Sequence, residues 1–85
     1  MALTQPPMRP RLQGCFSAVF PDARLDAVEE VTMDRVTEWD SVNQAILLAT
    51  IEDEFGIAIA PERYAELRSF LTIEEHLAKE CGRGA

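Results

Sequence analysis

Asp40 and Ser41 are the residues in this chain whose types and position are best suited to chemistry. They stand directly before a segment in which large apolar residues recur four apart, at Leu47, Ile51 and Phe55. This spacing predicts a helix over residues 41–55 that ends at Gly56, because glycine readily adopts the left-handed conformation of a helix C-terminus. The Ser41 hydroxyl then lies in solvent at the positive end of the helix dipole, where free backbone N–H groups stabilise a phosphate group.

A purely structural role for Ser41 has to be weighed against this chemistry. The sequence Ser41-Val42-Asn43-Gln44 fits the S-x-x-Q capping box, so Ser41 can also be interpreted as a simple N-terminal cap. Capping does not account for Val42, an apolar residue in the exposed first turn, unless a partner covers it. Both interpretations stay open at this point.

The other reactive side chains do not form a recognisable site. Cys15 and Cys81 lie far apart without metal-ligand spacing, and we expect both to be small buried residues of helices. His76 is the only histidine, so no metal site is expected. No Gly-x-Ser-x-Gly or nucleotide-binding pattern is present, and a chain of 85 residues has little mass with which to enclose a catalytic cavity.

The charge balance excludes some classes of partner. The chain has 15 acidic and 8 basic residues, which gives a formal net charge of -7. A nucleic-acid binder or a binder of acidic membranes normally has the opposite sign of net charge, so neither partner is expected.

No apolar stretch approaches membrane-spanning length, and the N-terminus lacks the apolar core of a signal peptide. We therefore expect a monomeric cytoplasmic protein with reduced thiols.

Hydrophobic periodicity predicts an all-α fold, a small bundle of four helices of which three are long and one is short. The first helix covers about residues 8–20 and ends before Pro21. A long first loop follows over residues 21–40, and its scattered apolar residues should hold it against the core. The helix over residues 41–55 then forms the centre of the bundle.

The C-terminal half supplies the remaining two helices. A short helix is predicted from Pro61 over about residues 61–67, because proline favours a first helical turn. Thr72-Ile73-Glu74-Glu75 fits a capping box and predicts the start of the last helix. The domain then spans residues 8–81, between flexible tails at residues 1–7 and 82–85.

The stretch Trp39-Asp40-Ser41-Val42, together with the helix that follows and its Phe55-Gly56-Ile57 end, resembles the acyl carrier protein family over about residues 33–80. In that family the serine of an Asp-Ser-Leu-type motif carries 4′-phosphopantetheine. The resemblance therefore assigns this cofactor, transferred from coenzyme A, to Ser41. It assigns Asp40 to recognition by the phosphopantetheinyl transferase. In having Trp39 directly before the Asp-Ser pair, the sequence resembles stand-alone carriers.

The resemblance also implies a function, that of a carrier and not an enzyme. Acyl intermediates would be held as thioesters on the arm and shuttled between partner enzymes of fatty-acid, polyketide or related specialised biosynthesis. The implied partners are acyl-activating, ketosynthase or acyltransferase enzymes with basic docking patches. The implied partner-binding surface lies on the helix, at Val42, Ala45, Ile46, Ala49, Glu52 and Asp53.

One departure from the family pattern concerns the identity of the partner. Ile46 and Ala49 stand where family members often have acidic residues, so the partner surface should be more apolar than usual. The alternative is an unmodified acidic helical protein-interaction module, in which Ser41 is only a helix cap and the same helix binds one partner permanently.

Overall fold

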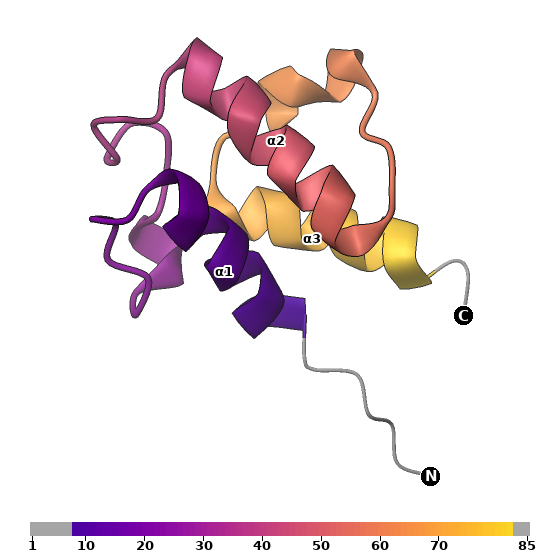
Figure 1. Cartoon of the computed structure of the whole chain (residues 1–85), viewed down its shortest axis with the longest axis horizontal. Helices are drawn as coiled ribbons and strands as arrows, with labels where there is room; N and C mark the ends of the chain where they lie inside the picture. The colour runs from indigo at the N-terminus through magenta and orange to yellow at the C-terminus, as the bar shows by residue number, and fades with distance from the viewer. Residues whose placement is uncertain (1–7, 83–85) are drawn as a thin grey trace, which may run out of the picture.

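Three α-helices and two 3-10 helices follow one another in the computed structural model, which describes residues 8–82 (Figure 1). In chain order they are α1 (Met8–Val19), η1 (Val28–Glu30), α2 (Ser41–Phe55), η2 (Pro61–Glu66) and α3 (Phe70–Gly82). The described residues contain no β-strand, only an isolated bridge between Thr32 and Ser69. The predicted all-α fold is confirmed. Of the predicted tails, residues 1–7 and 83–85 lie outside the described residues, whereas Gly82 belongs to α3.

α1 forms over nearly the range that the apolar spacing predicted. Its buried residues lie three and four apart on one face, at Leu12, Cys15 and Phe16. Phe20 extends this buried face just beyond the last turn, and Pro21 then ends the helical pattern because it lacks a backbone N–H. α1 packs against both α2 and α3, so it closes one side of the core.

An aromatic cluster joins three separate parts of the chain at the centre of this core. The Phe16 ring of α1 lies 5.0 Å from the Phe70 ring of α3 and 5.4 Å from the Trp39 ring, measured between centroids. The Phe20 ring lies 5.6 Å from the Trp39 ring and 6.3 Å from the Phe16 ring, so the three rings form a compact group. Since truncating a core phenylalanine to alanine costs about 3–5 kcal/mol, these contacts are a main source of stability.

The long first loop is held against the helices, as its scattered apolar residues predicted. Its buried side chains are Val28, Val31 and Trp39. Two backbone hydrogen bonds tie it to the start of α3, because the Met33 N–H donates to the Arg68 carbonyl and the Phe70 N–H donates to the Val31 carbonyl, both at 2.8 Å. The loop therefore forms a fixed wall beside η2 and α3.

α2 has the boundaries that the sequence predicted, and it is the element that carries Ser41. Leu47 and Ile51 are completely buried, and Gly56 ends the helix with a positive φ of 67°. Phe55 differs from the prediction, since its ring is only half-buried at the helix end. The Arg11 guanidinium lies over that ring at 4.4 Å from the centroid.

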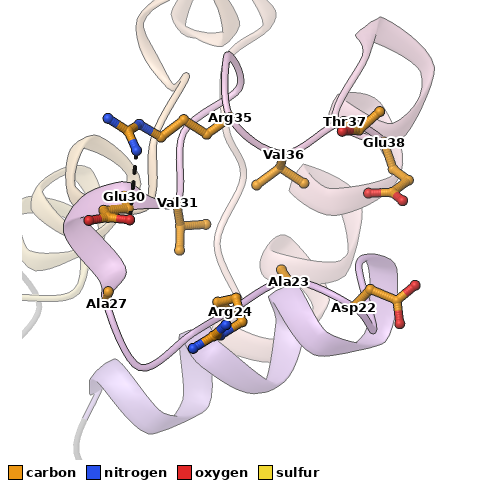
Figure 2. Close-up of a pocket in the computed structure, with 10 residues that line it drawn as sticks. All are labelled: Asp22, Ala23, Arg24, Ala27, Glu30, Val31, Arg35, Val36, Thr37 and Glu38. Atoms are coloured by element: carbon orange, nitrogen blue, oxygen red, sulfur yellow. Dashed lines mark ion pairs between the residues drawn. The ribbon is translucent and has the colours of Figure 1, made fainter.

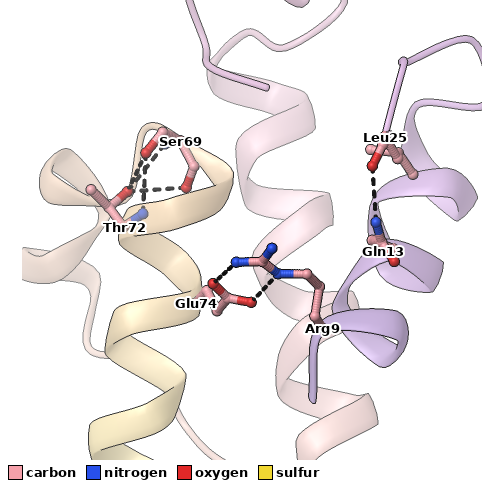
Figure 3. Close-up of polar contacts among 6 residues, drawn as sticks. All are labelled: Arg9, Gln13, Leu25, Ser69, Thr72 and Glu74. Atoms are coloured by element: carbon pink, nitrogen blue, oxygen red, sulfur yellow. Dashed lines mark hydrogen bonds and ion pairs between the residues drawn. The ribbon is translucent and has the colours of Figure 1, made fainter. Parts of the chain in front are cut away.

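The predicted start of the last helix is wrong by several residues. Ser69, and not Thr72, caps α3, since the Ser69 Oγ accepts the Thr72 N–H at 3.1 Å (Figure 3). The Thr72 hydroxyl in turn accepts the Ser69 N–H at 3.2 Å, so the two side chains cap the helix reciprocally. The earlier start places the buried Phe70 in the first turn, where it joins the aromatic cluster.

Polar contacts at the surface also hold α1 in place. The Arg9 guanidinium donates two hydrogen bonds of 2.7 Å to the Glu74 carboxylate of α3 (Figure 3). These hydrogen bonds lower the pKa of Glu74, because they favour its ionised form. The Gln13 amide of α1 donates to the Leu25 carbonyl of the first loop at 2.9 Å.

Candidate functional site

Ser41 is the first residue of α2, and its side chain is exposed to solvent. Within the part of the chain that the structure describes, no residue forms a hydrogen bond with the Ser41 hydroxyl. The backbone N–H groups of Ser41 and Val42 belong to the first turn, where no helical partner is available to them. The site thus combines a free hydroxyl with free backbone donors.

Asp40 performs the capping that the sequence pattern ascribed to Ser41. Its Oδ1 atom accepts the Asn43 N–H at 2.9 Å, and its backbone is extended, as is usual for a cap residue. The interpretation of Ser41 as the cap, which the sequence left open, is therefore wrong. The physical reason is that a carboxylate one residue earlier is already in position, and aspartate caps as well as serine does.

A hollow of about 260 Å³ lies beside Ser41, and we call it the Ser41 hollow. It is lined by residues from α2, from η2 and its C-terminal flank, and from the first loop: Met33, Ser41, Gln44, Tyr64, Ala65 and Arg68. No sequence pattern pointed to this hollow. Its walls come from segments that are far apart along the chain and meet only in the folded molecule.

Gln44 fixes the walls of the Ser41 hollow. It is a buried polar residue, and its amide nitrogen donates to the Tyr64 and Leu67 carbonyls at 3.1 and 2.9 Å. Its amide oxygen accepts a hydrogen bond from the Trp39 indole N–H. These bonds use both amide protons and the amide oxygen of Gln44 to join α2, the η2 region and the first loop, which gives this residue a structural role.

Most of the predicted partner-binding residues lie together on the solvent side of α2. We call this surface the outer face of α2, and it consists of Val42, Ala45, Ile46, Ala49 and Asp53. Val42 is 69% exposed and Ile46 49%, which is unusual for large apolar side chains one helical turn apart. This surface is a short apolar strip with Asp53 at its C-terminal end.

Glu52 does not belong to this surface. The resemblance placed Glu52 on the partner-binding surface, which requires an exposed carboxylate, and the expected exposure is wrong. Glu52 is half-buried, and its Oε2 atom accepts the Ile59 backbone N–H at 2.7 Å. The carboxylate therefore supports the segment that follows α2, where Ile59 is buried in the core.

The other candidate residues lie away from Ser41. His76 lines a separate hollow between η2 and α3, in the company of Glu75 and Lys79. Cys15 is buried, and this burial raises the pKa of its thiol to about 11. The side chain of Cys81 lies outside the part that the structure describes. Among the described residues, no group of three or more His, Cys, Asp or Glu could hold a metal ion.

A second hollow, of about 430 Å³, lies within the first loop (Figure 2). Its lining is of mixed charge, with Arg24 and Arg35 as cations and three carboxylates, Asp22, Glu30 and Glu38. The closest pair of opposite charges in its lining is Arg35 and Glu30, whose Nη1 and Oε1 atoms lie 3.7 Å apart. Because neither sign of charge dominates, this hollow does not indicate a class of ligand.

No similarity to known proteins adds to this description. The sequence matches no protein-family model, and it has no significant match to a curated protein or to a solved structure. Each described helix is too short or too polar to cross a membrane. The function must therefore be argued from the site: a free serine hydroxyl, a hollow beside it and an apolar outer face.

Proposed function

We propose that this chain is an acyl carrier protein that bears 4′-phosphopantetheine on Ser41 and presents thioester-bound acyl groups to partner enzymes. The observation that carries the proposal is the exposed Ser41 hydroxyl, which has no hydrogen-bond partner among the described residues because Asp40 caps the helix. A serine that only capped α2 would direct its oxygen to a backbone N–H. The motif around Ser41, which resembles the carrier family, supplies the identity of the group.

The residues around Ser41 fit such a group. The Ser41 oxygen would form a bond to the phosphorus of the pantetheine phosphate of coenzyme A, and the bond from that phosphorus to the bridging oxygen would break. Adenosine 3′,5′-bisphosphate leaves, and the serine proton passes to a base of the transferase. The free N–H groups of Ser41 and Val42 stabilise the resulting anion. The arm supplies a thiol that holds the acyl group as a thioester.

The outer face of α2 suits brief contacts with several partners. The apolar strip of Val42 and Ile46 would enter an apolar recess, while the acidic Asp40 and Asp53 at its two ends would meet basic residues around that recess. Long-range attraction by a chain of net charge -7 increases the rate of encounter with such basic patches. A small contact area keeps the complexes short-lived.

Intact-mass measurement tests the proposal. The chain is incubated with coenzyme A, magnesium and a broad-specificity phosphopantetheinyl transferase, beside a Ser41→Ala control and a proven carrier as positive control. We expect the wild-type chain to gain one phosphopantetheine and the Ser41→Ala chain to gain none. A folded wild-type chain that gains no mass while the positive control is loaded would refute the proposal.

A second function is favoured by the outer face of α2 alone. Two exposed apolar side chains on one helix, Val42 and Ile46, are also what a permanent protein-interaction module presents. In this alternative Ser41 stays unmodified. Ser41 would not be needed as a cap either, because Asp40 caps the helix. The same mass measurement distinguishes the two functions, because only the carrier is loaded.

A further inference from the structure

Arg68 lines the Ser41 hollow together with the serine, and it lies in the chain between η2 and α3. Its backbone is fixed, because its carbonyl accepts the Met33 N–H at 2.8 Å. Its guanidinium is the only charged group among the six residues that line the hollow. Arg68 is therefore the source of positive charge among the residues that line the hollow.

The guanidinium retains most of its capacity to donate hydrogen bonds. Among the described residues, its one ion pair is with Asp34, whose nearest carboxylate oxygen lies 3.9 Å away, beyond hydrogen-bond distance. Both side chains are largely exposed, at 61% for Arg68 and 89% for Asp34. Such exposed pairs are weak, so Arg68 can exchange this partner for a better one.

The charges around Ser41 are asymmetric. The Asp40 carboxylate is the immediate neighbour of Ser41 on one side and repels an anion attached there. Arg68, on the hollow side, attracts the same anion, and a guanidinium binds phosphate oxygens in a two-pronged geometry. An anionic group on Ser41 is thus drawn away from the outer face of α2 and toward the hollow.

We propose that Arg68 is a positioning residue, which holds the phosphodiester on Ser41 against the Ser41 hollow and so sets the direction in which the arm leaves the protein. This inference rests on the proposed function. Apart from Ser41 itself, the other lining residues, Met33, Gln44, Tyr64 and Ala65, contribute uncharged walls along which the first part of the arm lies. The outer face of α2 then stays clear for partners.

The test uses the phosphorus NMR signal of the loaded protein. Wild-type, Arg68→Gln, Arg68→Lys and Arg63→Gln chains are loaded enzymatically, and intact mass confirms the loading of each. The phosphorus signal is then recorded at increasing salt concentration. Arg63 is the matched control, because its exposure is similar (56% against 61% for Arg68), it pairs with Glu66 at 3.3 Å, and it does not line the Ser41 hollow.

The expected result is a salt-dependent shift of the phosphorus signal in the wild-type and Arg63→Gln chains. Arg68→Gln should lose that dependence and give a narrower line from a freer group, whereas Arg68→Lys should keep part of it. Identical signals in the wild-type and Arg68→Gln chains at all salt concentrations would overturn the inference, and so would an equal loss in Arg63→Gln. Failure of the proposed function is seen separately, as absence of loading in the mass spectrum of the wild-type chain.

Discussion

The Oδ1 atom of Asp40 accepts the backbone N–H of Asn43 at 2.9 Å, and this contact separates the cap of α2 from the candidate modification site at Ser41. Removing the cap with Asp40→Ala should lower the free energy of unfolding by about 1 kcal/mol, because the Asn43 N–H loses its acceptor. Ser41→Ala should change it by less than about 0.5 kcal/mol, since its hydroxyl bonds to no described residue. Urea denaturation measures both values.

Asp40→Asn provides the control for this pair, because asparagine caps helices nearly as well as aspartate does. It should retain most of the stability that Asp40→Ala loses. If Ser41→Ala proved as destabilising as Asp40→Ala, the serine would be the cap after all, and the argument for its free hydroxyl would fail.

The Glu52 carboxylate should contribute to stability and not to partner binding. Glu52→Ala leaves the N–H of the buried Ile59 without its 2.7 Å acceptor, so we expect a loss of about 1–3 kcal/mol in the free energy of unfolding. Asp53→Ala, one residue further on the exposed side, should change it by less than about 0.5 kcal/mol. Equal effects of the two substitutions in urea denaturation would show that the contact with Ile59 contributes nothing.

α2 could be predicted to the residue because independent signals agree on it. The polar pair Asp40-Ser41 marks its start, apolar residues spaced by four mark its buried face, and Gly56 marks its end. The start of α3 was mispredicted because Ser69 and Thr72 are both good capping residues. What decides between them is the position of Phe70 in the aromatic cluster, a tertiary contact that local sequence does not encode.

The candidate site was predictable only in part, for the same physical reason. Helical spacing places Val42 and Ile46 on the exposed side of α2, so this surface follows from the sequence. The Ser41 hollow does not follow from it, because Arg68 reaches the neighbourhood of Ser41 only through the folding of η2 against α2. Gln44 holds that arrangement through backbone carbonyls, which have no sequence signature.

Cys15 should make stability depend on pH in the alkaline range. Burial, with a smaller contribution from Glu54, raises the pKa of its thiol from 9.0 to about 11 in the folded chain. In the unfolded chain the thiol ionises from about pH 9, so the stability due to this shift is fully present below about pH 9. It is lost as the pH rises toward about 11.

The measurement compares the wild-type and Cys15→Ala chains by urea denaturation from neutral pH to about pH 11. Their difference in free energy of unfolding should shrink as the pH rises, and other titrating groups cancel in that difference. Titration of the thiol by ultraviolet absorbance in a Cys81→Ser background gives a direct check. A difference that stays constant across the range, or a thiol that ionises near its usual value, would show that Cys15 is accessible to water.

The outer face of α2 should determine how fast partners act on this chain. Val42→Asp and Ile46→Asp place a charge in the middle of the apolar strip, which a partner recess would have to desolvate. We expect each to reduce the kcat/KM of the phosphopantetheinyl transferase for this chain about tenfold, equivalent to about 1.4 kcal/mol. Because both side chains are exposed, the free energy of unfolding should change by less than about 0.5 kcal/mol.

Leu71→Asp is the matched control, because Leu71 is the other large apolar side chain among the described residues that is well exposed, and it lies on α3 instead of α2. Leu71→Asp adds the same charge and also removes an exposed apolar side chain, so it should leave kcat/KM within about twofold of the wild-type value if docking uses α2. An equal reduction in all three variants would mean that added negative charge, and not the apolar strip, slows the transferase. A marked drop in melting temperature for Val42→Asp or Ile46→Asp would instead assign these side chains to packing, and the outer face of α2 would no longer be a candidate docking surface.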